Sequence, residues 1–370
     1  MIYRARPSNA VRSWIADKRS AYTHGGETVC PGFHLYRGFV GCPAWAAGTP
    51  CTYCYLRTTF NGQRDPELRK GVAWVDKNTD EHTPINCITC GRDFDPRDLD
   101  AVFYHEQVPH QPLTEAEQAL ALCDSRQLPT VNNARAAVTK WLAAHGAEEC
   151  GDGGCNDFGY HGCDMRVLNA GELADSLGFS PDENPHVEML LDIFSDSATN
   201  PHGHKVLFLT KAGLEATKAH LEGWIPSENV IVSWSVGNGG TFHEPSCSPV
   251  FGHYGRLEAA GWASWRGWRT RFRIDPIIWP GLDGIRQWAS GVAATPEDTG
   301  PELITLGTLR HRGGRVKLSA EERISIYRAA LEGLRDGGYE GPVGLCKETA
   351  EVIREVLGIE PGEMQCNCVA

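Results

Sequence analysis

Three cysteines lie close together in a stretch of the sequence that favours a loop. Cys42, Cys51 and Cys54 fall within residues 41–56, GCPAWAAGTPCTYCYL, where glycine and proline interrupt regular secondary structure. Three thiolates on one loop can hold three irons of a four-iron cluster and leave the fourth iron open to another ligand. A Cys-x-x-Cys pair is also half of a common zinc site, and free cysteines pack well in cores. The loop by itself leaves these interpretations open.

A second group of cysteines belongs to the polar, irregular segment 58–128 and the stretch that follows it. Cys87 and Cys90 form a Cys-x-x-Cys-Gly knuckle, which is typical of half of a tetrahedral zinc site. Candidates for the other half are three cysteines of ECGDGGCNDFGYHGC and two histidines: Cys150, Cys155, Cys163, His105 and His110. We favour zinc here, but an auxiliary iron–sulfur cluster would use the same ligands, and unrelated reduced thiols are a third alternative.

The composition indicates a protein without membrane segments. The chain has 370 residues, of which 41% are hydrophobic and 22% charged, and no apolar run reaches the length of a membrane span. Its first residues, MIYRARPSNAVRSW, lack the apolar stretch of an export signal. Fourteen cysteines at irregular spacing then indicate metal ligands and free thiols rather than disulfides. We therefore expect a cytoplasmic location.

The net charge of −12 argues against binding nucleic acid through bulk electrostatics, so any such surface has to be local. One stretch alternates basic and aromatic residues: Arg256, Arg266, Arg269, Arg271 and Arg273 with Trp262, Trp265, Trp268 and Phe272. These side chains can grip phosphates and stack on unpaired bases. The alternative, which we favour, is a strand with a solvated basic face and aromatic side chains packed beneath it.

Apolar runs of strand length alternate with segments of helical length. We expect strands at 35–40, 166–169, 205–210, 230–236, 271–278 and 303–309, and helices at 130–145, 212–223, 252–261 and from a capping box at Ser319 and Glu322 onward. Each strand ends in a polar or glycine-rich set, which is typical of α/β barrels whose sites lie on loops. The predicted fold is α/β, a partial six-stranded (β/α) TIM-like barrel, open on one side.

The predicted organisation has four parts. Residues 1–57 form an N-terminal cap, the first strand and the cysteine loop, and residues 58–128 form an inserted cysteine-containing subdomain. Residues 129–315 complete the barrel, and residues 316–370 form a C-terminal helical extension.

The cysteine loop is similar to the cluster loop of the radical S-adenosylmethionine (radical SAM) superfamily. That loop has a Cys-x-aromatic-Cys pair, here CTYC at 51–54. The strand ends from about residue 41 to 309 resemble the spore photoproduct lyase branch, enzymes that reverse a thymine dimer in spore DNA, as do the strings LCKE at 345–348 and CNC at 366–368. One spacing departs from the superfamily: eight residues, rather than the usual three, separate Cys42 from Cys51, and Cys30 is the alternative first ligand.

The resemblance implies a [4Fe–4S] cluster held by Cys42, Cys51 and Cys54, with SAM bound at the free iron. It implies that reductive cleavage of SAM gives a 5′-deoxyadenosyl radical, which abstracts hydrogen from a thymine-type nucleic-acid substrate. An electron donor such as flavodoxin or ferredoxin is implied as well. The alternatives are radical SAM modification of a nucleoside, a modified DNA base, a peptide or a small molecule, and a non-catalytic zinc-binding protein.

The resemblance also implies which residues contact SAM. Lys211 and Ser235, at strand ends, would contact the carboxylate or ribose with Asn238 nearby, Glu172 would take the ammonium, and Tyr53 lies within the cysteine pair. Each SAM group needs an oriented polar partner in a mostly apolar barrel mouth. The structural alternatives are a surface lysine at 211, a strand hydroxyl at 235 and a helix cap at 172.

One departure concerns the return of hydrogen to the product. The dimer lyases use a cysteine in a Cys-Thr-Ser-Asp string at the second strand end, whereas this chain reads NAGE at 169–172. Cys163 and Cys346 are the candidate replacements, each only if folding brings it into the site. Photoproduct repair and action on another base are therefore both retained as hypotheses.

Overall fold

The computed structural model describes the N-terminal part of the chain in short pieces and the C-terminal half almost continuously. The described residues are 15–16, 22–24, 27–30, 34–36, 85–86, 93–94, 131–144, 167–171, 175–237, 253–277, 281–294, 300–308, 318–346 and 348–365. The fold below refers to these residues.

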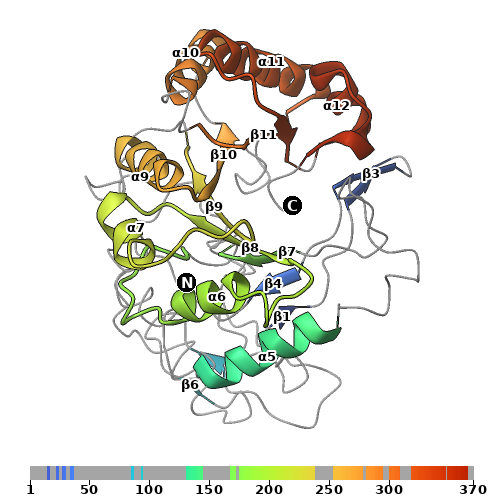
Figure 1. Cartoon of the computed structure of the whole chain (residues 1–370). Coiled ribbons are helices and arrows are strands. Elements are labelled where there is room, and N and C mark those ends of the chain that lie inside the picture. Colours follow the sequence, from blue (N-terminus) through green and yellow to red (C-terminus); the bar gives the residue numbers. More distant parts are fainter. Residues whose placement is uncertain are drawn as a thin grey trace.

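One eight-stranded sheet organises the molecule (Figure 1). Its strands, in spatial order, are β1 (Ile15–Ala16), β4 (His34–Tyr36), β7 (Val167–Ala170), β8 (Lys205–Thr210), β9 (Val230–Ser235), β10 (Arg269–Ile277), β11 (Leu303–Thr308) and β12 (Val343–Leu345). Every neighbouring pair from β4 to β12 is parallel, and β1 is antiparallel to β4. The sheet is open, with β1 and β12 at its edges.

The predicted parallel β/α architecture is confirmed. The six expected strands are β4 and β7 to β11, and the observed bounds of β8 are those predicted. The prediction missed the strands at both edges, because two or three residues carry too little periodicity to be recognised. β12 comes from the segment predicted to be a purely helical extension, and it pairs with β11.

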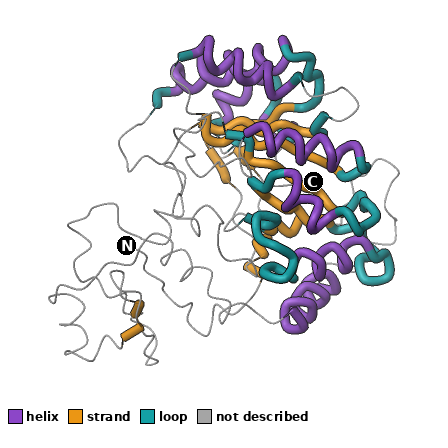
Figure 2. The backbone as a smooth tube through the Cα atoms, turned by 90° about the vertical axis from the view of Figure 1, so that its left-hand side faces the viewer, coloured by secondary structure: helices purple, strands orange, loops and turns teal. Residues whose placement is uncertain are grey.

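Helices cover one face of this sheet (Figures 1 and 2). They are α5 (Val131–Ala144), α6 (His186–Ser195), α7 (Leu214–Leu221), α9 (His253–Trp265), α10 (Leu282–Ala293), α11 (Ala320–Asp336) and α12 (Ala350–Leu357), followed by the 3₁₀ turn η5 (Pro361–Glu363). The predicted capping box of α11 is present, since the Glu322 N–H donates to Ser319 Oγ and the Ser319 N–H donates to Glu322 Oε2.

Two small hairpins lie outside the main sheet. β2 (Tyr22–His24) pairs with β3 (Glu27–Cys30), and β5 (Ile85–Asn86) pairs with β6 (Asp93–Phe94), both antiparallel.

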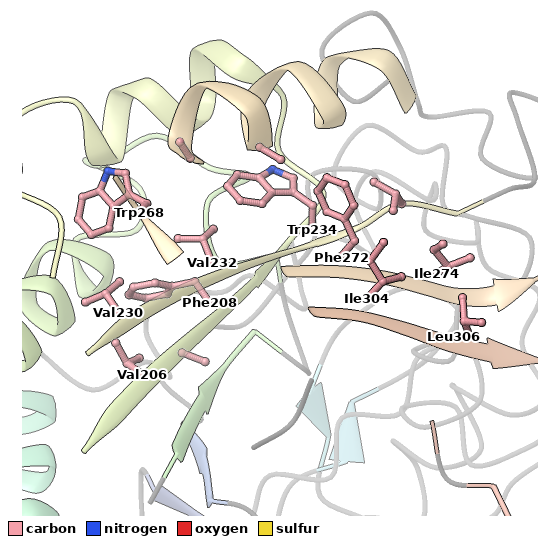
Figure 3. Packing of buried hydrophobic residues seen from close by; sticks show 14 of the residues in the cluster. Val206, Phe208, Val230, Val232, Trp234, Trp268, Phe272, Ile274, Ile304 and Leu306 are labelled. Carbon is pink, nitrogen blue, oxygen red and sulfur yellow. The ribbon is translucent and has the colours of Figure 1, made fainter. Parts of the chain in front are cut away.

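The two faces of the sheet differ because side chains alternate along each strand. On the helix-covered face, buried residues such as Phe208, Val232, Trp234, Phe272 and Ile304 form the main core (Figure 3). The opposite face, here called the inner face, carries a separate small apolar cluster of Val167, Leu207 and Ile231. Toward the carboxyl ends of the strands the inner face becomes polar, which is the edge where α/β barrels place their sites.

Candidate active site at the carboxyl edge of the sheet

A row of polar residues crosses the carboxyl edge of the sheet. Because Thr210 is level with Trp234, the next residues, Lys211 and Ser235, are neighbours across β8 and β9. Ser235 is level with Arg273 on β10, and Arg273 with Thr305 on β11. The structure therefore brings together Lys211 and Ser235, the two residues predicted to contact SAM. It places Arg273 and the hydroxyl of Thr305 in the same row, and neither was predicted to contact SAM.

The carboxylate of Asp175 fixes the chain where β8 ends. It accepts hydrogen bonds from Thr210 Oγ1 at 2.5 Å and from the Lys211 N–H at 3.1 Å, and the Ala212 N–H donates to Thr210 Oγ1 at 2.9 Å. Burial raises the pKa of Asp175 above its usual range, although these hydrogen bonds and the charge of Arg256 act in the opposite direction. Asp175 thus positions Lys211. This role could not be recognised from the sequence, because Asp175 lies in the string GELADS at 171–176, which resembles the capping segment of a helix.

Close contact between the ends of β7 and β8 depends on Gly171. Its φ is +127°, and a Cβ built there would lie 2.3 Å from Ser176 Oγ and 2.5 Å from the carbonyl oxygen of Leu209. Ser176 Oγ bridges the two strands by donating to the carbonyls of Ala170 at 2.5 Å and Leu209 at 3.0 Å. The backbone that leads into residue 172 is therefore held tightly.

Arg256 supports the end of β9 from the helix side. This arginine of α9 is fully buried, and its Nη1 donates to the carbonyl oxygen of Ser235 at 2.9 Å. A buried guanidinium needs such acceptors to offset its desolvation. Arg256 therefore orients the backbone at Ser235 and is not part of a solvent-exposed surface.

The basic and aromatic stretch does not lie on one exposed surface, because Arg256 and Arg271 are buried as well as Trp268 and Phe272. Trp268 and Phe272 are buried in the main core, whereas Trp265 is 71% exposed. The favoured alternative, a strand with a solvated basic face and aromatic residues beneath it, holds for the aromatic residues Trp268 and Phe272, which pack in the core. Its solvated basic face is corrected, because the arginines of β10 pair with the carboxylates of Glu302 and Asp275.

Glu302 forms ion pairs with both arginines nearest the start of β10. Arg269 binds it through two hydrogen bonds of 2.7 and 2.9 Å, and Arg271 Nε donates at 2.6 Å. Burial acts to raise the pKa of Glu302, but the hydrogen bonds and charges of both arginines outweigh it and hold that pKa below its usual value. Glu302 is therefore a carboxylate at neutral pH.

Cys346 lies at the same carboxyl edge, directly after β12. It is 3% exposed, its N–H donates to the Leu306 carbonyl at 2.7 Å, and Arg273 Nη2 lies 3.5 Å from its Sγ. Arg273 also binds Asp275 Oδ2 at 2.9 Å. Asp275 occupies the space over Gly307, where a Cβ would fall 2.4 Å from its Cγ. Folding thus brings Cys346, one of the two candidate hydrogen donors, to the carboxyl edge of the sheet, next to the row of polar residues.

A second buried carboxylate secures the segment after Cys346. Glu348 accepts from the Tyr327 hydroxyl at 2.9 Å and lies 3.2 Å from Arg323 Nε, while the Thr308 N–H donates to the Tyr327 oxygen at 3.1 Å. These contacts tie α11 to the ends of β11 and β12.

Most of the predicted ligands lie outside the described residues. This applies to Cys42, Cys51, Tyr53, Cys54, Cys87, Cys90, Cys150, Cys155, Cys163, Glu172 and Asn238. Within the described part, no group of three or more histidine, cysteine, aspartate or glutamate side chains can hold a metal ion. The iron–sulfur and zinc assignments stay predictions. The described residues fit SAM in chemical type, since an ammonium and hydroxyls at a strand edge suit a carboxylate and a ribose.

In the described ranges, no helix combines the length and apolar character needed to cross a membrane.

Comparisons with known proteins find solved structures that are similar over part of the chain. No family model matches the sequence, and no curated protein matches it. A spore photoproduct lyase mutant with bound AdoMet and dinucleoside spore photoproduct is 14% identical with a TM-score of 0.36, over 55% of this chain and 52% of that chain. A second spore photoproduct lyase structure, complexed with dinucleoside spore photoproduct, is 13% identical with a TM-score of 0.42, over 59% of this chain and 68% of the other.

Two further solved structures are similar over part of the chain. A domain of a pyruvate-formate lyase-activating enzyme from Bacteroides vulgatus is 18% identical with a TM-score of 0.31, over 43% of this chain and 92% of that domain. An HMG-CoA lyase from Brucella melitensis is 13% identical with a TM-score of 0.33, over 51% and 64% of the two chains. The photoproduct lyase and the activating enzyme are radical SAM enzymes. At these scores the similarity concerns the arrangement of strands and helices and carries no functional argument.

Proposed function

We propose that this protein is a radical SAM enzyme whose reaction occurs at the carboxyl edge of its sheet. The observation that supports the proposal most strongly is topological. β4 ends at Tyr36, just before the cysteine loop in the sequence, and β4 is parallel to β7, β8 and β9. Gly171 and Lys211 follow β7 and β8, and Ser235 ends β9, so these residues lie at one edge of one sheet. In this proposal the cysteine loop extends from β4 at the same edge.

In this proposal the described residues bind and orient SAM. Lys211 and Ser235 contact its carboxylate or ribose, and Asp175 and Arg256 hold the backbone from which those two residues extend. Cys42, Cys51 and Cys54 would hold a [4Fe–4S] cluster, which would supply the reducing electron for the cleavage of SAM.

The proposed substrate class is a thymine-type nucleic acid, as the resemblance to photoproduct lyases implies. Cys346 is the proposed hydrogen donor, because its thiol lies at the carboxyl edge beside Arg273. A reduced flavodoxin or ferredoxin is the proposed electron source. A different nucleoside or base is the second candidate substrate, since Asn169 stands where the photoproduct lyases have their donor cysteine.

The first experiment measures iron, sulfide and zinc in anaerobically purified and reconstituted protein, followed by reaction with SAM and dithionite. We expect about four irons per chain and formation of 5′-deoxyadenosine. Cys51→Ala and Cys54→Ala should lose both, whereas Cys346→Ala should keep both. Zinc without iron after reconstitution would contradict the proposal.

The substrate is tested with dinucleoside spore photoproduct in D₂O. Turnover to the thymine dinucleotide, with deuterium in the product of the wild type and loss of that deuterium in Cys346→Ala, would support Cys346 as donor. If 5′-deoxyadenosine forms but the photoproduct is unchanged, the radical SAM class stands and the substrate assignment fails.

A further inference from the structure

Arg273 donates hydrogen bonds to a carboxylate and to a thiol at the carboxyl edge of the sheet. Its Nη2 lies 2.9 Å from Asp275 Oδ2 and 3.5 Å from Cys346 Sγ, and its Nε lies 3.2 Å from the same carboxylate oxygen. Both charged residues lie on the inner face, because they alternate along β10 with Phe272 and Ile274 of the main core. Their side chains are 17% and 20% exposed, so solvent reaches the charged pair beside the buried thiol.

The contact between Arg273 and Cys346 limits where the thiol hydrogen can point. A guanidinium has five N–H donors and no acceptor, so the sulfur can only accept from it. The S–H bond of Cys346 is therefore directed away from Arg273. The backbone of the cysteine is fixed as well, since its N–H donates to the Leu306 carbonyl at 2.7 Å.

Asp275 offsets the charge that Arg273 brings to the sulfur. An arginine beside a cysteine favours the thiolate, whereas a nearby carboxylate and burial both favour the thiol. The arginine nitrogen that donates to the sulfur, Nη2, is the one that is ion-paired with Asp275. Asp275 packs directly over Gly307, which leaves room for this arrangement because a Cβ there would fall 2.4 Å from Asp275 Cγ.

The other charged groups close to the end of β12 belong to the helix side. Glu348 lies 3.2 Å from Arg323 and accepts a hydrogen bond from the hydroxyl of Tyr327, a residue of the main core. β11 and β12 themselves carry no ionisable side chain. Among the described residues, Arg273 and Asp275 are therefore the charged pair on the same face as the thiol.

We propose that Asp275 and Arg273 are positioning residues that hold Cys346 as a thiol and direct its hydrogen for transfer to a carbon radical. The inference rests on the proposed function for the step that it serves. In that step the S–H bond breaks homolytically and a C–H bond forms, which leaves a thiyl radical on Cys346. A thiolate has no hydrogen to transfer, so the step depends on the carboxylate that offsets Arg273.

Alkylation by iodoacetamide tests the ionisation of Cys346, because the thiolate is the nucleophile. Full-length reconstituted wild type, Asp275→Asn, Asp275→Glu and Arg273→Gln are compared between pH 6 and pH 10, with Cys346 followed by peptide mass mapping. Asp275→Asn removes the negative charge beside Arg273, so the midpoint of the profile should fall by about one pH unit and the rate at pH 7 should rise about fivefold or more. Arg273→Gln should move the midpoint upward, and Asp275→Glu should stay close to the wild type.

Glu302→Gln is the matched control, because it removes a carboxylate from arginine pairs at the other end of the same strand. Its Cys346 profile should equal that of the wild type. A role in packing alone would speed alkylation in Asp275→Asn and Arg273→Gln alike, at every pH and without a change of midpoint. That result, or a wild-type midpoint in a folded Asp275→Asn protein, would overturn the inference.

The second measurement is the deuterium that passes from D₂O into the product for each 5′-deoxyadenosine formed. As pH rises, this ratio should fall about one pH unit earlier in Asp275→Asn than in the wild type, in parallel with alkylation. If alkylation shifts but the deuterium ratio does not, the pair does not serve hydrogen transfer and the inference is overturned. If the wild type forms no 5′-deoxyadenosine, the proposed function fails, and the alkylation profiles still show whether the pair holds Cys346 as a thiol.

Discussion

The backbone N–H of Lys211 donates a hydrogen bond of 3.1 Å to the buried carboxylate of Asp175. The same carboxylate accepts from the Thr210 hydroxyl, so one side chain determines the direction in which the chain leaves β8. A residue that makes no contact with the ligand can in this way control the position of a residue proposed to bind the ligand.

Replacement of Asp175 should therefore affect stability and SAM binding together. We expect Asp175→Ala to lower the free energy of unfolding by about 2 to 4 kcal/mol, because two buried donors lose their acceptor. Affinity for S-adenosylhomocysteine should fall as Lys211 loses its position. Urea unfolding and equilibrium dialysis test this, with the exposed Asp182→Ala as control. Unchanged affinity in a folded Asp175→Ala protein would refute the positioning role.

The tight contact at Gly171 predicts a large effect of one added methyl group. Gly171→Ala should destabilise the protein by about 3 kcal/mol or more, because φ is +127° and the new Cβ would meet the Leu209 carbonyl. Gly261→Ala is the matched control, since that helical glycine has open space around its Cβ position and should gain about 0.5 to 1 kcal/mol. Similar urea midpoints for the two variants would contradict this account of the β7 end.

The ion pairs of Glu302 predict a defined dependence on pH. Its pKa is lowered in the folded state, so its contribution to stability is present above the pKa of the unfolded chain and is lost as pH falls through the folded pKa. Glu302→Gln should lower the free energy of unfolding by about 1 to 3 kcal/mol at pH 7. The difference from the wild type should shrink in acid. Denaturant unfolding between pH 7 and pH 3 measures this, and the exposed Glu258→Gln should show no such trend.

The contact between Gly307 and Asp275 predicts a linked effect at Cys346. Gly307→Ala would place a methyl group 2.4 Å from Asp275 Cγ, so Asp275 must move away from Arg273. We expect a loss of about 1 to 3 kcal/mol and faster alkylation of Cys346, located by peptide mass mapping. Gly300→Ala, which has open space, is the control. Equal alkylation rates in the two variants would show that the Arg273–Asp275 pair does not protect the thiol.

The parts of the fold that could be predicted from sequence are those governed by local pattern. The strand at 205–210 and the capping box at Ser319 depend on residues within a few positions of one another, so their signals are complete in the sequence. β1 and β12 are too short for such a signal, and they exist because a neighbouring strand supplies their hydrogen bonds.

In the candidate site, too, only residues marked by a local sequence pattern could be predicted. Lys211 and Ser235 became candidates through a resemblance to the strand ends of a known family, which is visible in short strings of sequence. Cys346 became a candidate hydrogen donor in the same way, through the string LCKE at 345–348. Asp175 and Arg256 could not be predicted, because their roles depend on contacts with residues 21 to 36 positions away. In the part of the chain that the structure describes, the buried amide of Asn169 makes no hydrogen bond, and only the folded arrangement reveals this.

The order of the strands has a consequence for how the protein is made. From β8 to β12 each strand pairs with the one that precedes it both in the sheet and in the chain, so this part can grow strand by strand during synthesis. β4 differs, because its parallel partner β7 is synthesised much later, and Tyr36 meets His186 across 150 positions. A ribosome that pauses before residue 167 would therefore hold a chain that already contains Cys42, Cys51 and Cys54 but lacks every strand that pairs in parallel with β4.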